Sequence, residues 1–232
     1  MSKVLVVYSG GLDSTALLYK CISEFDEVEA INFDYNSKHN ASERKAAQKI
    51  CDLEGIKLTE VNMPFINELF KSDLLQSGGD IPEGHYAEDN MKSTVVPFRN
   101  GIMLSIASGY AESIDADTIA IANHFGDRAV YPDCRQEFVQ PMIGAILEGT
   151  GGKVRLISPF VGLTKAQIVE VGCSHGAPLE LSWSCYNGGD RPCLKCSTCA
   201  ERTEAFLLNN LQDPSLSSEE WEKAINIWKK YS

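Results

Sequence analysis

Short apolar runs alternate with longer amphipathic stretches over most of this chain. Five of the runs have the length of buried strands: residues 3–8, 28–33, 56–61, 118–122 and 154–158. Apolar residues recur with a helical period in five other stretches: residues 14–25, 38–53, 102–111, 136–147 and 164–171. Strands that alternate with helices are typical of βαβ units, which form parallel sheets covered by helices. The pattern therefore predicts an α/β fold with a parallel sheet.

Residues 63–92 interrupt this alternation with prolines, paired glycines and a polar run. An irregular stretch of this length inside a compact domain is usually a functional loop. We expect it to form a lid over an active site, and a plain surface excursion is the alternative.

The last part of the chain has a different pattern, in which closely spaced cysteines precede two helical stretches. In the final helix, Trp221, Ile225 and Trp228 share one face. We expect this face to pack on the body of the protein, with a dimer contact as the alternative. The pattern predicts an α/β domain at residues 1–181 and a small cysteine-bearing, helical region at residues 182–232.

A glycine-rich turn, Tyr-Ser-Gly-Gly-Leu-Asp-Ser-Thr, joins the first predicted strand to the first helix at residues 8–15. Two glycines let the backbone turn sharply and approach a ligand closely. Asp13, Ser14 and Thr15 suit the start of a helix, where free N–H groups favour an anion. No lysine follows the second glycine where a GxxxxGK[ST] loop requires one.

This turn instead resembles SGGxDS/T, the PP-loop of ATP pyrophosphatases. Those enzymes split ATP between the α- and β-phosphates and activate an oxygen of their substrate as an adenylate. The resemblance implies that residues 1–181 form an ATP-binding domain. The alternative is an ordinary strand–helix turn whose two glycines serve packing.

Composition and charge narrow the possible partners. The chain has 232 residues and a net charge of −11, which argues against a broad nucleic-acid surface. No apolar stretch approaches the ~20 residues of a membrane span, and the opening residues enter a strand without the layout of a signal peptide. We therefore expect a cytoplasmic protein without a membrane or nucleic-acid partner, whose eight cysteines are reduced or metal-bound.

Four of the cysteines follow the spacing C-x7-C-x2-C-x2-C: Cys185, Cys193, Cys196 and Cys199. Four thiolates make a closed tetrahedral site, which favours one structural zinc ion per chain. Folding of this segment should then depend on the metal. An iron–sulfur cluster is the alternative, because it too takes four cysteines.

Three motifs together are similar to a single family. They are the PP-loop, Tyr-Pro-Asp-Cys-Arg at residues 131–135, and Trp-Ser-Cys-Tyr followed by Pro-Cys-x-x-Cys-x-x-Cys at residues 183–199. In this order they resemble the 7-cyano-7-deazaguanine synthases, and the resemblance covers nearly the whole chain. It implies a Rossmann-like, adenine-nucleotide alpha-hydrolase-like sheet with a small C-terminal zinc knuckle.

The chain departs from the family pattern at a few positions. Phe98 and Leu194 stand where the family has glycine, and Gln136 stands where it has proline. The loop at residues 123–130 also differs from the usual one. These departures leave the acceptor and the nucleophile open, but not the ATP chemistry.

The resemblance implies a ligase that forms C–N bonds and acts, with Mg²⁺, on small molecules as a homodimer. ATP, ammonia and 7-carboxy-7-deazaguanine would give 7-cyano-7-deazaguanine through an adenylated carboxylate and an amide. The ATP site would comprise Tyr8, Ser9, Gly10, Gly11, Leu12, Asp13, Ser14, Thr15, Ala16, Leu17 and Leu18. Asp13, Arg99 and Arg135 would be catalytic, with Asp13 helping to hold Mg²⁺ and Lys165 a further candidate for phosphate. Asn123, Asp127 and Asp133 follow a predicted strand, where open α/β sheets bind ligands, and would bind the substrate.

Three other interpretations stay open. In the first, the chain is a tRNA-modifying PP-loop ligase or thiolase, although its acidic charge argues against this. In the second it uses the same acid with another amine, or stops at the amide. In the third it is a non-enzymatic zinc adaptor that binds a nucleotide, which the complete loop disfavours.

Overall fold

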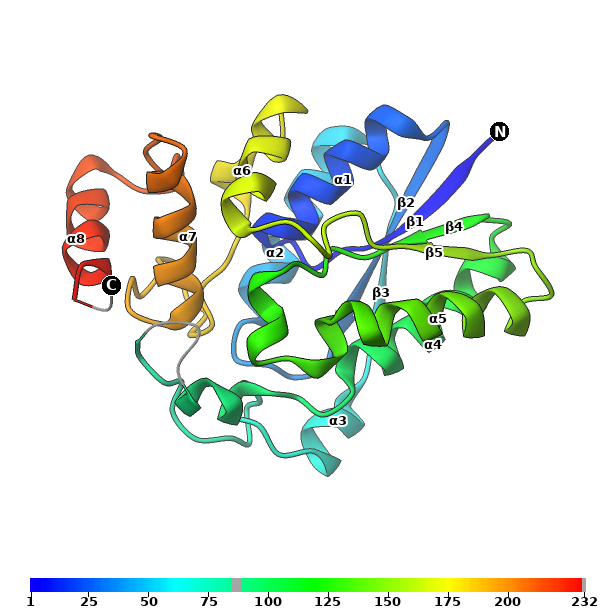
Figure 1. Cartoon of the computed structure of the whole chain (residues 1–232), viewed down its shortest axis with the longest axis horizontal. Coiled ribbons are helices and arrows are strands. Elements are labelled where there is room, and N and C mark those ends of the chain that lie inside the picture. Colours follow the sequence, from blue (N-terminus) through cyan, green and yellow to red (C-terminus); the bar gives the residue numbers. More distant parts are fainter. Residues whose placement is uncertain (85–88, 231–232) are drawn as a thin grey trace.

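The computed structural model describes residues 1–84 and 89–230, and its centre is a parallel five-stranded sheet (Figure 1). The strands lie in the order β3-β2-β1-β4-β5, and every neighbouring pair is parallel. Their bounds are β1 Lys3–Val7, β2 Glu27–Asp34, β3 Leu58–Asn62, β4 Thr118–Ala120 and β5 Arg155–Ile157. The predicted α/β fold with a parallel sheet is confirmed.

Helices cover both faces of this sheet (Figure 1). They are α1 Leu12–Glu24, α2 Asn40–Glu54, α3 Pro64–Leu69, α4 Arg99–Ser113, α5 Gln136–Gly149, α6 Lys165–Ser174, α7 Ser197–Leu208 and α8 Ser218–Trp228. Helices α4 and α5 lie on one face, and α1, α2 and α6 on the other. Helix α7 packs on α6, and α8 packs on α7.

Alternation along the strands creates a separate apolar core on each face of the sheet. On β1, Leu5 points into the core beneath α4 and α5, whereas Val4 and Val6 point into the core beneath α1 and α2. All three side chains are fully buried. Period-two alternation of this kind is expected when both faces of a parallel sheet are covered by helices.

The order in which strands are added to the sheet reverses at the central strand, β1. After β1 the chain builds β2 and β3 on one side, then crosses to β4 and β5 on the other. Loops that leave β1 and β4 at their carboxyl ends therefore diverge and open a crevice, which is where doubly wound sheets bind ligands. The glycine-rich loop after β1 and the polar loop after β4 both start at this crevice.

Two departures from the family pattern have a common backbone explanation. Phe98 has a φ angle of 53° and Leu194 one of 63°, both in the left-handed region. Glycine enters this region without strain, whereas other residues do so at a cost. The Phe98 ring folds over Gly101 and makes an edge-to-face contact with Phe138 at 5.8 Å, which helps to hold the strained turn.

The described part of the irregular stretch at 63–92 packs on the body of the protein. It contains α3, and its residues Ile66, Leu74 and Leu75 are buried in the core beneath α4. Residues 85–88 lie outside the described residues, and a lid role for the stretch stays a prediction. In the described part of the chain, no helix combines the length and the apolar character needed to cross a membrane.

Candidate active site

A pocket of about 200 Å³ opens at the crevice between the carboxyl ends of β1 and β4. Ten of the residues predicted for binding or catalysis line it: Tyr8, Ser9, Gly11, Leu12, Asp13, Ser14, Arg99, Asn123, Asp127 and Lys165. Segments far apart in the sequence supply its walls, including Trp183, Ser184 and Tyr186, which flank the first cysteine of the cluster. The predicted region at 182–232 therefore contributes side chains to the same pocket as the α/β body. Its division from residues 1–181 stays a prediction.

The loop after β1 is held in a compact turn by its own polar groups. The Gly11 N–H donates to Ser9 Oγ at 3.0 Å, and the Ser14 hydroxyl donates to the Gly11 carbonyl at 3.2 Å. The Trp183 N–H donates to the Gly10 carbonyl at 2.9 Å, which ties the C-terminal region to the loop. Helix α1 begins at Leu12, so its first free N–H groups lie at the pocket.

Gly10 allows helix α2 to approach this loop closely. A Cβ atom at Gly10 would lie 2.3 Å from the Glu43 carbonyl oxygen and 2.7 Å from the Ala47 nitrogen, both backbone atoms. Its φ angle of 88° is also one that a side chain disfavours. The glycine is therefore required for packing against α2 as well as for the turn, and the packing brings Glu43 beside the loop.

Asp13 belongs to a cluster of charged side chains from four parts of the chain. Its Oδ2 atom lies 2.5 Å from Lys165 Nζ, which is itself 3.2 Å from Glu201 Oε2 on α7. His124 Nε2 lies 3.2 Å from Lys165 Nζ and 3.4 Å from Asp127 Oδ2. Three carboxylates thus surround one lysine and one histidine, and the second oxygen of Asp13 is buried without a hydrogen-bond partner.

The charges in this cluster stabilise one another against burial. Burial disfavours the charged form of Asp13, but Lys165 and His124 outweigh it and hold the pKa of that carboxyl below its usual value. Burial likewise opposes the charge on Lys165, yet Asp13 and Glu201 raise the pKa of the ammonium group. Asp13 and Lys165 are therefore a charged pair at neutral pH, with an anion and a cation presented at the pocket.

Arg99 lies at the first position of α4 and faces β2 across the pocket. Its guanidinium donates to the Tyr35 hydroxyl at 2.9 Å, and its Cζ atom lies 5.4 Å from the centre of the Tyr35 ring. The Asn100 N–H next to it donates to the Asp133 carboxylate at 2.9 Å. Arg99 has no carboxylate within ion-pair distance in the described residues, so its charge is available to an anionic ligand.

Several predicted site residues lie outside the pocket lining. Asp133 is buried and binds the start of α4 through Asn100, while Arg135 Nε donates to the Arg128 carbonyl at 2.8 Å. Other predicted members of the ATP site lie behind the pocket, and three of them are fully buried in the core: Ala16, Leu17 and Leu18. Gly10 and Thr15 support the loop from behind. The predicted roles of these residues in binding or catalysis stay predictions.

Sequence reasoning missed a second group of titratable side chains in the pocket. His39 and Glu43 follow β2 at the start of α2, and Tyr186 and Glu201 come from the C-terminal region. The first two could have been found, because they follow a strand in the same way as the predicted residues after β4. Tyr186 belongs to the Trp-Ser-Cys-Tyr motif, which marked the family but not a place in the pocket, and Glu201 carries no signal because the packing of α7 on α6 brings it there.

Burial controls the protonation of this second group. It raises the pKa of Glu43 to about 8, although Arg99 and the Ser9 hydroxyl act in the opposite direction. It lowers the pKa of His39 to about 3, and the positive charge of Arg99 adds to the effect. At neutral pH the imidazole of His39 is therefore neutral, and a large share of Glu43 is protonated.

The raised pKa of Glu43 predicts a pH-dependent gain in stability for Glu43→Gln. The folded wild type binds this proton more tightly than the unfolded chain, so its contribution is complete below the ordinary pKa of 4.5 and is lost as pH rises through about 8. Each unit of pKa shift is equivalent to about 1.4 kcal/mol. Glutamine has no such proton. The free energy of unfolding of the variant, relative to that of wild type, should therefore increase between pH 5 and pH 9, by about a few kcal/mol. Urea unfolding at both pH values measures this, and an equal difference at the two would contradict it.

The four predicted metal-ligand cysteines converge at the start of α7. All four sulfur atoms lie within 4.8 Å of one another. The Cys196–Cys199 sulfur distance is 3.5 Å, and the Cys185–Cys196 and Cys193–Cys199 distances are both 4.0 Å. A tetrahedron with metal–sulfur bonds of about 2.3 Å has edges of ~3.8 Å, so the set fits one ion.

Backbone N–H groups complete the surroundings of these sulfurs. The N–H groups of Lys195 and Cys196 point at Cys193 Sγ, at 3.5 and 3.3 Å. The Cys193 N–H points at Cys185 Sγ at 3.3 Å. Such donors stabilise thiolates, which are the form of cysteine that binds metal. The four-cysteine group can therefore hold a metal ion.

The fold and the pocket define an α/β nucleotide-binding enzyme of the PP-loop type. The chain belongs to the family described as queuosine biosynthesis protein QueC, whose model matches residues 3–210. A 7-cyano-7-deazaguanine synthase from Porphyromonas gingivalis is 48% identical over 211 residues, which are 91% of this chain and 95% of that protein. One from Archaeoglobus fulgidus is 43% identical over 229 residues, which are 98% of this chain and 95% of that protein.

A solved structure shares the fold at low sequence identity. It is the NMN synthetase from Francisella tularensis, with a TM-score of 0.50 and 13% identity. The match covers 99% of this chain and 84% of that one. At this identity the likeness concerns the fold alone.

Proposed function

We propose that this protein is a 7-cyano-7-deazaguanine synthase, which converts 7-carboxy-7-deazaguanine, ammonia and ATP into the nitrile. The observation that carries the proposal is the pocket itself, where the PP-loop, the Asp13–Lys165 pair and Arg99 all present groups for anions. Relatives of that name, 43–48% identical over nearly the whole chain, support it. The reaction class is ligation, with ATP split to AMP and pyrophosphate.

Adenylation of the acid requires that the departing pyrophosphate be held and neutralised. Free N–H groups at the start of α1 and the hydroxyls of Ser9 and Ser14 suit this role. Lys165 supplies a positive charge beside the loop, and Asp13 holds that charge in place at 2.5 Å. Preorganised charges of this kind stabilise a phosphoryl-type transition state without reorganisation during the reaction.

Arg99 is suited to the carboxylate of the substrate. A carboxylate is a poor electrophile until its oxygen attacks the α-phosphate, and a guanidinium aligns and partly neutralises it. Asn123 and Asp127 line the same pocket and offer an amide and a carboxylate to the polar edge of the base. For Asp133 and Arg135, which lie behind this wall, we propose supporting roles: Asp133 fixes the start of α4, where Arg99 sits.

Two metal ions belong to this proposal. Zinc is proposed for the four-cysteine site, because its sulfur spacing fits a closed tetrahedral ion. Mg²⁺ is proposed to accompany ATP, held by Asp13, whose second carboxylate oxygen has no partner, with Asp127 nearby. Bound there, it would neutralise phosphate charge during adenylation.

We further infer a cytoplasmic homodimer. None of the eight cysteines, all of which lie among the described residues, forms a disulfide, which suits a reducing compartment. Leu208, the last residue of α7, and Leu211 just after it are exposed and offer an apolar contact for a second copy. Trp221 instead packs on the core of the same chain. Light scattering of the purified protein tests the dimer.

Product analysis tests the activity directly. Purified protein with the acid, ammonium and ATP should yield the nitrile and AMP, detected by mass spectrometry. ADP as the nucleotide product would contradict adenylation, and accumulation of the amide alone would favour a relative that stops there. If several amines are offered together and the acid is joined to one other than ammonia, the result would favour the alternative in which the enzyme uses another amine. Turnover that requires tRNA would favour the tRNA-modifying alternative.

A further inference from the structure

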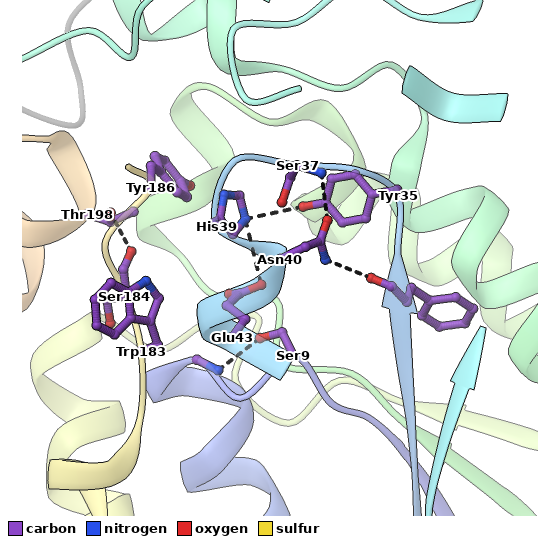
Figure 2. Close-up of polar contacts among 12 residues, drawn as sticks. Ser9, Tyr35, Ser37, His39, Asn40, Glu43, Trp183, Ser184, Tyr186 and Thr198 are labelled. Atoms are coloured by element: carbon purple, nitrogen blue, oxygen red, sulfur yellow. Dashed lines mark hydrogen bonds and ion pairs between the residues drawn. The ribbon is translucent and has the colours of Figure 1, made fainter. Parts of the chain in front are cut away.

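Glu43 and His39 line the pocket but take no part in the binding of ATP or the acid as proposed above. His39 is the N-cap of α2 and Glu43 lies in its first turn, and both are directed toward the PP-loop and the C-terminal wall (Figure 2). His39 Nε2 lies 3.7 Å from Glu43 Oε2 and 3.4 Å from the Tyr35 hydroxyl. The Glu43 side chain is 17% exposed and that of His39 only 4%.

Hydrogen bonds at the start of α2 fix the position of this pair. Asn40 Oδ1 accepts from the Ser37 N–H at 2.7 Å, and Asn40 Nδ2 donates to the Phe33 carbonyl at 3.1 Å (Figure 2). The beginning of the helix is thereby tied to the end of β2. The close packing at Gly10 then sets Glu43 against the loop, where a Cβ atom on Gly11 would lie 3.5 Å from Glu43 Oε1.

The Glu43 carboxylate has the Ser9 hydroxyl beside it but, within the described part of the chain, no cationic side chain to balance its charge. In the described residues, no lysine or arginine nitrogen lies within ion-pair distance of the Glu43 carboxylate, whose only such neighbour is His39. His39 Nδ1 is buried and makes no hydrogen bond of good geometry, although the Tyr186 backbone beside the ring partly opposes the fall of the His39 pKa. Buried polar atoms are rarely left unpaired, and an unpaired atom that lines a pocket is ready for a ligand.

The tautomer of His39 specifies the ligand atom that fits. Two oxygen atoms face Nε2, which favours the proton on that nitrogen and leaves Nδ1 as an acceptor. A carboxylate and an imidazole acceptor together suit a small ligand that carries several N–H bonds. Ammonia is such a ligand, and the proposed reaction consumes it.

We propose that Glu43 and His39 form the ammonia site, where Glu43 is the general base that takes the proton from the attacking nitrogen. The inference rests on the proposed function. The nitrogen lone pair forms the C–N bond at the adenylated carbonyl carbon, the C–O bond to AMP breaks, and AMP leaves with that electron pair. The proton shed by nitrogen passes to the Glu43 carboxylate and then to solvent. His39 is the positioning residue, which accepts an N–H hydrogen bond through Nδ1.

The same base serves the dehydration of the amide. After the amide oxygen is adenylated, the nitrogen must lose two protons while the C–O bond breaks and AMP departs, which leaves the C≡N bond. The amide nitrogen formed beside Glu43 is already in reach of the carboxylate. A group with a pKa near the working pH is an efficient proton acceptor, and burial gives Glu43 such a pKa, about 8.

Separate assays of the two half-reactions of Glu43→Gln test this inference. Exchange of pyrophosphate into ATP with the acid, in the absence of ammonia, reports adenylation and should be unchanged. Amide formation with ammonium should fall by ~100-fold in kcat, the usual contribution of a general base. Hydroxylamine, a stronger nucleophile that is neutral at pH 7, should still trap the adenylate at a near wild-type rate. Asp52→Asn, an exposed carboxyl later in the same helix, is the matched control and should change neither assay.

His39 is tested by the Michaelis constant for ammonium. His39→Leu removes the acceptor nitrogen and should raise this constant by about tenfold, as expected for one lost hydrogen bond. His39→Gln, whose amide oxygen accepts, should recover part of the loss. Undiminished amide formation by Glu43→Gln, or an equal loss in both half-reactions, would overturn the inference. No exchange by wild type with the acid would overturn the proposed function first, and this inference with it.

Discussion

Replacing Asp13 by asparagine is expected to reduce the adenylation rate by ~10³-fold, the upper range for removal of one preorganised electrostatic group. The Asp13 carboxylate holds Lys165 Nζ at 2.5 Å beside the PP-loop and presents a second, unpartnered oxygen. Asparagine keeps the size of the side chain but loses the charge. Lys165 would then be drawn to Glu201, its other carboxylate neighbour at 3.2 Å, and away from the position of the phosphates. Pyrophosphate exchange into ATP with the acid measures this directly.

The same variant also tests folding, because Asp13 is part of a partly buried ion cluster. Loss of one member of a buried pair destabilises a protein when the remaining charge has no partner. Lys165 retains Glu201, so the fold should persist, and circular dichroism with urea unfolding checks this. Asp115→Asn is the control, since Asp115 is exposed in the turn before β4, and asparagine tolerates its φ angle of 56°. Undiminished exchange by folded Asp13→Asn would remove the loop carboxylate from the mechanism.

Cys199→Ser should lose the bound metal and, with it, the structure of the C-terminal part of the pocket. Cys199 is buried at the start of α7, and its sulfur lies 3.5 Å from that of Cys196. Structural zinc sites contribute ~10–16 kcal/mol of apparent binding energy, which is lost with a ligand. Wild type should contain about one zinc per chain by elemental analysis, and the variant almost none.

Activity should be lost together with the metal. Trp183, Ser184 and Tyr186 line the pocket and lie within two residues of Cys185, one of the proposed metal ligands. When the metal is lost, Cys185 is no longer held in place. The hydrogen bond from the Trp183 N–H to the Gly10 carbonyl should then break, and the PP-loop should lose this support. Cys173→Ser, at an exposed free thiol, is the matched control and should keep both metal and activity. Retention of a full equivalent of metal by Cys199→Ser, or iron in the wild type, would contradict the zinc assignment.

The fold could be predicted well from the sequence because its signals are local. Apolar runs and helical periods identified every strand of the sheet, and the helical stretch predicted from residue 164 is present as α6, with Thr164 as its N-cap in a full capping box. Boundaries moved by a few residues where the loops gave no signal, as at α1, which begins at Leu12 and not at Ser14. Propensity changes gradually along a chain, whereas a boundary depends on which backbone groups find partners in three dimensions.

The sequence by itself determined the chemistry that depends on residues close together in the chain. The loop at residues 8–15 indicated a nucleotide, and the spacing of four cysteines indicated a metal, because each set is one short segment whose geometry is local. Only the tertiary structure decided what surrounds these groups. Lys165, Glu201 and His124 meet Asp13 because α6, α7 and the loop after β4 converge on one crevice.

The same reason explains Glu43 and His39. Burial sets their pKa values, and it results from packing of α2 against Gly10 on one side and of Tyr186 against His39 on the other. No sequence pattern encodes desolvation, since it depends on atoms contributed by distant segments. The PP-loop motif identified which nucleotide chemistry the protein performs, and the fold decided which side chains are placed to move its protons.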